Sequence, residues 1–508
     1  MNKEEAKEKI RAWLKDRHNL AFLAILLFAV ILRLYFFSLT INQPLWWDES
    51  EYMLKAKNIA LGTPDTGWTQ LRPFLFPYFS SIFFYFGFGI GFIKFILILL
   101  SIANIILVYV VGKNLFSKKA ALIATFLFSV FYLDLFWGNR IGTNSPELFF
   151  GLLIFFFFLQ YWKHGKENYL ILIFPLTAVG YLLRFTSLLY LLIIILFLLI
   201  VKRKEAFKIK KLNYSLLIFV IIAIPVFIFA FLSGTNLFLN LQNALQGTTL
   251  YRGFSTAIPV TFKYMNLVFF SLQGKPFTGI FYLLNFLLFA LFIIGLLSFY
   301  KLFLMLDDVF SGGKKYSNYL LILIWLIIAL LFYGSVIDIF DDRYFLMAFP
   351  AIFLVIGLGA ESIFNIIKKS SKYLSIIVIV AVLLLGGYSL ISHSDEIVKF
   401  KLNTYDSLKT AGLWIKDNSS PGDFIISSAV PQLTYYSERS TFHFNSTQQE
   451  FYNFIQEKKP KYVILTAWEK SPDWVYKWYQ NNSDIELVNA FASKDTAQPT
   501  TIIYKLKI

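Results

Sequence analysis

The chain has 508 residues, of which 57% are hydrophobic and 58 are phenylalanine, and its mean hydropathy is +0.62. This composition excludes an ordinary soluble protein and indicates a polytopic membrane protein, because many apolar runs are long enough to cross a bilayer core of about 30 Å. The absence of cysteine excludes disulfides, thiolate metal sites and a cysteine nucleophile. The net charge of +16 comes from short loops between apolar runs, which indicates membrane topology rather than nucleic-acid binding.

The apolar runs predict about eleven spanning helices. These lie at residues 20–39, 93–112, 119–137, 147–162, 169–182, 185–201, 214–233, 278–300, 318–337, 344–363 and 373–391. We assign residues 73–88 to an interfacial or re-entrant helix, because a full span there would move the later lysine clusters outside. With that choice the lysine clusters are cytoplasmic, which predicts a cytoplasmic N-terminus and an extracytoplasmic C-terminal domain.

A membrane domain is therefore predicted over residues 1–391, with an external loop at 40–92 and a small α/β domain over 392–508. In the small domain, strands are expected at 424–428, 461–466 and 500–506, and helices at 408–417, 448–457 and 472–480. Alternating strands and helices favour a mixed α/β domain. It has no glycine-rich phosphate loop, so no nucleotide site is predicted there.

The string WWDESEY at residues 46–52 carries the densest acidic group near any membrane-embedded part. One interpretation is a solvated loop beside an interfacial tryptophan pair. The other is a catalytic base, because a carboxylate walled by tryptophan is desolvated and its pKa rises. Base catalysis of this kind contributes about 10²–10⁴-fold to a rate.

An acidic pair, a short amphipathic stretch and the Arg-Pro string LRPFLFP (71–77) follow one another here. This order resembles the first external loop of the GT-C glycosyltransferases, such as the protein O-mannosyltransferases and lipid A aminoarabinose transferases. The string PQLTYYSER (431–439) resembles the external tail domains of several GT-C families. The resemblance implies sugar transfer from a dolichyl- or undecaprenyl-phosphate donor, with inversion, to a protein, lipid-linked glycan or surface glycan outside the membrane. It implies Asp48 as the base and Glu49 as the second candidate.

The string NRIGTNSPE (139–147) stands between the predicted third and fourth spans. Many GT-C relatives have an arginine there, followed by an acid that opens the fourth helix. The resemblance implies that Arg140 binds the donor phosphate, that Asn144 takes the place of the acid and that Glu147 substitutes for it. The alternative is an ordinary helix start, with Asn or Ser as the cap, an early Pro and Glu in the first turn. That alternative explains every residue except Arg140.

Three further arginines are candidate ligands of the donor phosphate. Arg184 lies between two apolar runs, and an intramembrane arginine is costly and marks a functional site unless it reaches the membrane surface. Arg343 and Tyr344 belong to the string DDRYFL (341–346), which resembles the start of a late helix in GT-C enzymes. A guanidinium binds two phosphate oxygens at once, although an ordinary Asp–Arg pair at a helix start fits equally well. Arg72, in the Arg-Pro turn, is the third candidate.

No cofactor is predicted, because the four histidines (His18, His164, His393 and His443) show no metal-ligand spacing with an acid. A divalent cation on Asp48, Glu49 and Asp341 is the less favoured alternative, since an arginine neutralises the leaving phosphate. The expected partners are the polyprenyl-phosphate sugar, its acceptor and membrane lipids, and not nucleic acid. The second function class is a transporter or flippase of a lipid-linked substrate, which is disfavoured because the sequence has no paired repeats with broken helices.

Overall fold

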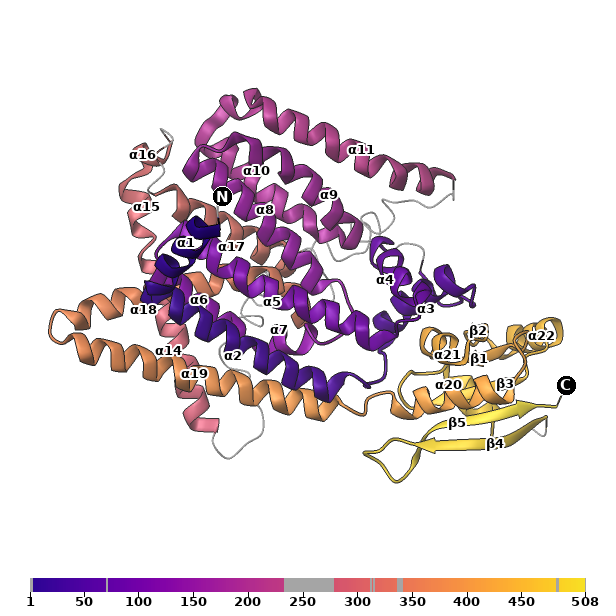
Figure 1. The fold of residues 1–508 in the computed structure, drawn as a ribbon. Helices are drawn as coiled ribbons and strands as arrows, with labels where there is room; N and C mark the ends of the chain where they lie inside the picture. The colour runs from indigo at the N-terminus through magenta and orange to yellow at the C-terminus, as the bar shows by residue number, and fades with distance from the viewer. Residues whose placement is uncertain are drawn as a thin grey trace. The chain divides into compact units, whose positions relative to one another are not determined.

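The computed structural model of the protein describes residues 3–69, 72–232, 278–310, 313, 316–335, 341–480 and 484–507 (Figure 1). The chain forms two compact units, which we name the helical unit and the sheet unit and describe separately. The helical unit comprises Met1–Phe36, Leu97–Asn139 and Thr143–Glu396. The sheet unit comprises Phe37–Ile96, Arg140–Gly142 and Ile397–Ile508.

The helical unit is built almost entirely from helices, three of which, α2, α5 and α19, extend at one end into the sheet unit. Its α-helices are α1 (Lys3–Lys15), α2 (Arg17–Thr40), α5 (Ile90–Leu115), α6 (Lys118–Ser129), α7 (Tyr132–Trp137), α8 (Asn144–His164), α9 (Ile173–Leu183), α10 (Leu188–Lys202), α11 (Lys210–Leu232), α14 (Thr278–Leu297), α15 (Tyr300–Leu304), α16 (Leu306–Phe310), α17 (Ser317–Ser335), α18 (Phe349–Lys368) and α19 (Lys372–Lys401). Its 3₁₀-helices are η1 (Glu167–Leu172), η2 (Phe185–Ser187), η3 (Arg203–Lys208) and η4 (Asp342–Ala348).

Eight stretches of the described chain are helical, long and apolar enough to cross a membrane. They are Arg17–Thr40, Ile90–Leu115, Asn144–His164, Phe185–Lys208, Phe286–Leu304, Ser317–Gly334, Asp342–Lys368 and Lys372–Asn418. The protein is thus a multi-pass membrane protein, while the total of eleven spans stays a prediction. The predicted span at 214–233 coincides with α11 except for its last residue, which lies outside the described part.

The prediction of one continuous span over residues 119–137 is wrong. The chain forms α6, which is too short to cross a bilayer at about 1.5 Å per residue, and then the short helix α7. Buried polar groups bind the chain at the break between the two helices. The Arg33 side chain donates through Nη1 to the carbonyl oxygen of Ser129 at 3.0 Å and pairs with Asp134 on α7. The carbonyl at the end of α6 is thereby satisfied without a further helical turn.

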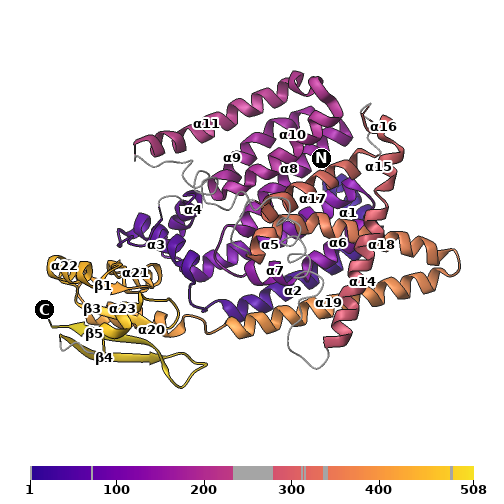
Figure 2. The same cartoon turned by 180° about the vertical axis from the view of Figure 1, so that it is seen from behind.

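Among the eight candidate spans, the stretch Asp342–Lys368 is the most buried, and its helix α18 packs against α6 and α14. Two glycines allow the close approach to α14. A Cβ added at Gly359 would collide with the carbonyl oxygen of Leu291, and one added at Gly295 would collide with that of Val355. Small residues let membrane helices pack backbone to backbone in this way. On another side of the unit, α2 and α19 run side by side in both views (Figures 1 and 2), and Tyr35 donates to Asp395 at 3.0 Å.

The apolar segment at 73–88 forms α4 (Leu75–Tyr85), whose 11 residues are too few to span a bilayer. Its length agrees with a helix that does not span the membrane, while the interfacial or re-entrant placement stays a prediction. The amphipathic stretch before it forms α3 (Trp47–Leu61), which ends at Gly62 in the left-handed conformation (φ 69°) that glycine accommodates without steric cost. Both helices belong to the sheet unit and pack against each other.

The sheet unit contains a five-stranded mixed sheet in the order β2-β1-β3-β5-β4. Its strands are β1 (Ile425–Ser427), β2 (Thr441–Phe442), β3 (Tyr462–Thr466), β4 (Ile485–Ala492) and β5 (Pro499–Leu506), and its helices after the membrane segments are α20 (Asp406–Asn418), α21 (Val430–Ser437), α22 (Gln448–Lys458) and α23 (Asp473–Trp478). Strand β1 is parallel to β2 and β3, whereas β5 is antiparallel to β3 and β4. The predicted α/β character and the three predicted strands and helices are confirmed.

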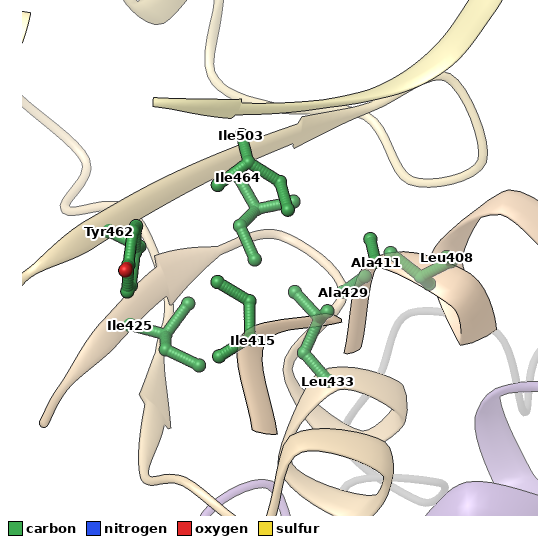
Figure 3. Close-up of a cluster of buried hydrophobic side chains, with 9 residues drawn as sticks. All are labelled: Leu408, Ala411, Ile415, Ile425, Ala429, Leu433, Tyr462, Ile464 and Ile503. Carbon is green, nitrogen blue, oxygen red and sulfur yellow. The ribbon is translucent and has the colours of Figure 1, made fainter. Parts of the chain in front are cut away.

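Side chains alternate across this sheet and build a core on each face. Figure 3 shows the core beneath α20 and α21, formed by Leu408, Ala411, Ile415, Ile425, Ala429, Leu433, Tyr462, Ile464 and Ile503. On the other face, Ile426 and Val463 pack with residues of α22 and α23. Strand β4 was not predicted. It is a largely exposed strand at the edge of the sheet, and its residues do not alternate between buried and exposed positions. Helix α19 also runs on to Lys401, beyond the predicted end of the last span at residue 391.

Candidate active site

The acidic string forms the first turn of α3, so helical geometry separates its three acids. Asp48 and Glu51 are three residues apart and share one face, whereas Glu49 is turned about 100° away from Asp48. Glu49 and Glu51 are buried at 4% and 2% exposure, while the Asp48 side chain is 28% exposed. Asp48 is therefore the acid of this turn that remains accessible to a substrate.

Arg72 bridges the two acids on the shared face of α3. Its Nη2 lies 2.7 Å from Asp48 Oδ1, and its Nε pairs with Glu51. Glu51 also accepts a hydrogen bond from the Thr69 hydroxyl at 2.8 Å. Burial raises the pKa of Glu51, with Arg72 and Thr69 opposing the rise, while the two carboxylates raise the pKa of Arg72. Arg72 therefore remains charged and fixes the orientation of the Asp48 carboxylate.

Glu49 belongs to a separate, fully buried group. Its Oε2 accepts from Arg140 Nη2 at 2.6 Å and from the Trp46 backbone N–H at 2.8 Å, and its Oε1 accepts from the Ile141 N–H at 3.2 Å. The Arg140 guanidinium lies over the Trp46 ring, 3.6 Å from its centroid, and is 3% exposed. This contact ties the 140–142 segment to the start of α3.

A second cluster lies in the helical unit around Arg184, where α9 ends. Arg184 has an extended backbone between α9 and η2, and its side chain is 20% exposed. It pairs with Glu147 through Nε at 3.0 Å and donates through Nη1 to Asn144 Oδ1 at 2.8 Å. Glu147 also accepts from the Thr186 hydroxyl. The side chains that open α8 therefore hold Arg184 in place.

Tyr344 connects Arg184 with Arg343. The guanidinium carbons of Arg184 and Arg343 lie 5.1 Å and 5.5 Å from the centre of the Tyr344 ring. The Arg343 guanidinium also lies 5.0 Å from the Trp137 ring, and its Nε pairs with Asp341 at 2.7 Å. Two partly exposed guanidinium groups thus gather on one tyrosine, an arrangement suited to an anionic group with several oxygens.

The structure bears on the ordinary helix-start interpretations of Asn144 and of the Asp–Arg pair at residues 341–343, with opposite outcomes. Asn144 is not the cap of α8: the cap position is Thr143, and the Asn144 amide oxygen accepts from Arg184 instead. The ordinary Asp–Arg pair at a helix start does exist, because Asp341 caps η4 and pairs with Arg343. Arg184 does not stand alone in the membrane, since Glu147 compensates its charge.

Residues 71–229 match the family described as dolichyl-phosphate-mannose-protein mannosyltransferase. No curated protein sequence matches the chain significantly. Among solved structures, ArnT from Cupriavidus metallidurans bound to undecaprenyl phosphate has a TM-score of 0.61 and 12% identity, covering 95% of this chain and 97% of that chain. AglB from Archaeoglobus fulgidus, in complex with an inhibitory peptide and a dolichol-phosphate, has a TM-score of 0.57 and 14% identity, covering 88% and 69%.

The arabinofuranosyltransferase AftD from mycobacteria is similar as well, with a TM-score of 0.52 and 11% identity over 96% of this chain and 40% of that chain. All three are GT-C glycosyltransferases. The chain shares its fold with these three enzymes. The family match on this fold supports the predicted glycosyltransferase activity, and neither comparison supports the alternative of a transporter or flippase.

The arrangement of the acids among the described residues bears on whether the chain holds a metal ion. Within the described ranges, no group of three or more His, Asp or Glu side chains is arranged to hold a metal ion. The carboxylates of Asp48 and Glu51 instead share the guanidinium of Arg72. The proposed absence of a cofactor stays a prediction, which metal removal tests.

Sequence reasoning missed two charged groups of this chain. Glu51 was not weighed as a site residue, although its spacing from Asp48 on a helix places both on one face. Arg33 and Asp134 form a buried ion pair in the helical unit, to which the Ser101 hydroxyl contributes hydrogen bonds at 2.7 Å to each side chain. The sequence did carry a signal for this pair. Arg33 and Asp134 have opposite charges and lie inside two different predicted spans, and intramembrane charges pair with one another.

Proposed function

We propose that this GT-C chain transfers a sugar from a polyprenyl-phosphate donor, dolichyl- or undecaprenyl-linked, to a hydroxyl or amide group of a protein, lipid-linked glycan or surface glycan. The acceptor atom attacks the anomeric carbon, the bond from that carbon to the phosphate oxygen breaks, and polyprenyl phosphate leaves. Attack opposite the phosphate inverts the anomeric centre. The observation that carries the proposal is the mannosyltransferase family match over residues 71–229 on a GT-C fold. ArnT and AglB have been solved with undecaprenyl phosphate and dolichol-phosphate, which supports this donor class.

In this proposal the donor phosphate binds Arg184 and Arg343. Support comes from their partial exposure, their common contact with Tyr344 and the planar guanidinium geometry, which suits phosphate oxygens. Asn144 and Glu147 would orient Arg184 and balance its charge before the donor arrives. As the sugar leaves, negative charge grows on the phosphate, and preorganised cations stabilise that charge most effectively.

Asp48 is the proposed base, and it accepts the proton of the attacking acceptor group. Its exposure and its contact with Arg72 favour this role, since the ion pair at 2.7 Å fixes the orientation of the carboxylate. Glu49 is a weaker candidate, because three hydrogen bonds already occupy its two oxygens in a buried setting. We accordingly assign Glu49, Arg140 and Trp46 to holding the start of α3, and Arg72 to positioning Asp48 rather than to binding the donor.

The orientation belongs to the same proposal. The N-terminus would be cytoplasmic and the residues after α19 extracytoplasmic, because the lysine clusters between apolar runs sort that way. Alkaline phosphatase fused after residue 508 should be active, and the same enzyme fused after residue 208, in a predicted cytoplasmic loop, should be inactive. The reverse pattern would overturn both the orientation and the proposed external site.

The activity itself is tested in two steps. First, lipid extracts of a deletion strain are analysed by mass spectrometry for a polyprenyl-phosphate sugar that accumulates when the enzyme is missing. That lipid is then supplied to the purified chain, and release of polyprenyl phosphate is measured. Arg343→Ala should weaken donor binding, whereas Lys477→Ala on α23, far along the chain and exposed, serves as the control. The proposed activity is wrong if no polyprenyl-phosphate sugar accumulates in the deletion strain. It is also wrong if the purified chain releases no polyprenyl phosphate from the lipid that accumulates.

A further inference from the structure

A cavity of about 420 Å³ in the sheet unit is lined by more basic than acidic side chains. Lysines from two helices line it: Lys57 from α3, and Lys409 and Lys416 from α20. The single acid among the lining residues is Glu438, at the end of α21. Both Lys57 and Lys416 pair with the same oxygen of Glu438, the latter at 2.7 Å, so the cavity lining holds three lysines and a single carboxylate.

The lysines are held toward the cavity by specific contacts. The Lys57 ammonium lies 5.1 Å from the centre of the Tyr435 ring, and its side chain is only 16% exposed. Burial lowers the pKa of Lys57, which means that its charge is incompletely solvated. Lys409 donates to the Asn42 carbonyl at 3.1 Å, in the turn that follows α2. A bound anion would compensate the positive charge that Glu438 leaves over.

The position along the chain locates the cavity at the membrane surface. Ile41, which directly follows α2, lines it together with Ile90 and Gly91, the first residues of α5. Both helices are long and apolar enough to cross a membrane. Their ends therefore mark the level of the lipid headgroups, where basic side chains attract anionic phosphate.

We infer that this cavity binds a phosphate group at the membrane surface. The chemistry combines three ammonium groups from two helices with an aromatic wall and one shared carboxylate. The phosphate comes either from a lipid headgroup or from a water-soluble phosphate compound, and the experiment below separates these sources. The inference goes beyond the proposed sugar transfer and does not depend on it, because none of these side chains belongs to the proposed donor or base residues.

Binding is tested on the full chain purified in a neutral detergent. The probes are dihexanoyl phosphatidic acid, dihexanoyl phosphatidylcholine as a lipid without net charge, and sodium pyrophosphate, with affinities from isothermal titration calorimetry. The double variant Lys409→Gln, Lys416→Gln removes two of the three lysines. The matched control is Lys458→Gln, Lys477→Gln, which makes the same change of net charge on α22 and α23 of the same unit.

Phosphatidic acid should bind more tightly than phosphatidylcholine. Each lysine near a membrane phosphate contributes about five-fold to affinity, so the double variant should bind phosphatidic acid about 30-fold more weakly. The control variant should change the affinity by less than about two-fold, and equal midpoints of thermal unfolding should show that both variants are folded. Pyrophosphate that displaces the lipid identifies a soluble phosphate compound as sufficient, and its failure to do so identifies a lipid headgroup. Equal weakening in both double variants, or no preference over phosphatidylcholine, would overturn the inference.

Discussion

Two acids of α3, Glu49 and Asp48, should separate into a structural and a catalytic role when each loses its charge. Glu49→Gln keeps the size of the side chain and an oxygen acceptor, but it leaves the Arg140 guanidinium, 3% exposed, without its carboxylate. Breaking a buried ion pair on one side costs about 3–5 kcal/mol. We expect that loss in the free energy of unfolding, because the buried Arg140 guanidinium loses the carboxylate that it pairs with at 2.6 Å.

Asp48→Asn should behave in the opposite way. Its ion pair with Arg72 is partly exposed, at 28% and 26%, and such pairs contribute about 0–1 kcal/mol to stability. The rate of sugar transfer should fall by about 10²–10⁴-fold, because an amide cannot accept the acceptor's proton. Affinity for the lipid donor should stay within about two-fold, since Asp48 is assigned no contact with the phosphate.

Both quantities are measured on the same purified variants in mixed micelles. Unfolding by denaturant is followed by tryptophan fluorescence, and transfer is expressed per folded molecule, so that loss of protein does not count as loss of catalysis. Asp65→Asn, shortly after the end of α3, serves as the control, because its ion pair with Lys55 is also partly exposed, at 43% and 24%. A folded Glu49→Gln enzyme with lost transfer, together with a fully active Asp48→Asn enzyme, would exchange the two roles and refute the reasoning.

Three further outcomes follow from the same structure. Arg343→Lys should restore only part of the donor affinity lost in Arg343→Ala, which is about 1.5–3 kcal/mol, because an ammonium lacks the paired geometry; donor titrations measure both. Arg33→Met should destabilise the protein by about 3–5 kcal/mol in denaturant unfolding, and adding Asp134→Asn should recover much of this loss. Additive losses in the double variant would show that the two side chains are not coupled. Extended dialysis against EDTA should leave the transfer rate unchanged, and recovery of a lost rate by Mg²⁺ or Mn²⁺ would contradict the metal-free proposal.

Much of the fold could be predicted because hydrophobic length and helical periodicity are local properties of the sequence. The spans that became α2, α5 and α8 were identified by runs of apolar residues alone. The break between α6 and α7 is different, since the local sequence stays apolar through it. Its cause is Arg33, which is 96 residues from the Ser129 carbonyl it binds, and no local pattern carries that information.

The residue types of the candidate site were predictable, but their partners were not. Arg184 and Arg343 stood out as charges beside apolar runs, and the structure gathers both on Tyr344. Their common contact depends on the fold, because η2 and η4 are far apart in the sequence. The same holds for Asn144, which local pattern assigned to a helix cap and which binds Arg184 across 40 residues.

In helix α3, known secondary structure is enough to predict which acids share a face, but not which cation each acid binds. Once residues 47–61 are helical, the 3.6-residue period alone places Asp48 with Glu51 and turns Glu49 away. Adjacency in the sequence suggests the wrong grouping, in which Asp48 and Glu49 form one acidic pair. What the period cannot supply is the identity of the cation on each side. Arg72 is 24 residues from Asp48, whereas Arg140 is 91 residues from Glu49 and lies beyond another spanning helix. Arg72 bridges two acids and is partly exposed, whereas Arg140 is fully buried, and on this difference we propose catalysis for Asp48 and a structural role for Glu49.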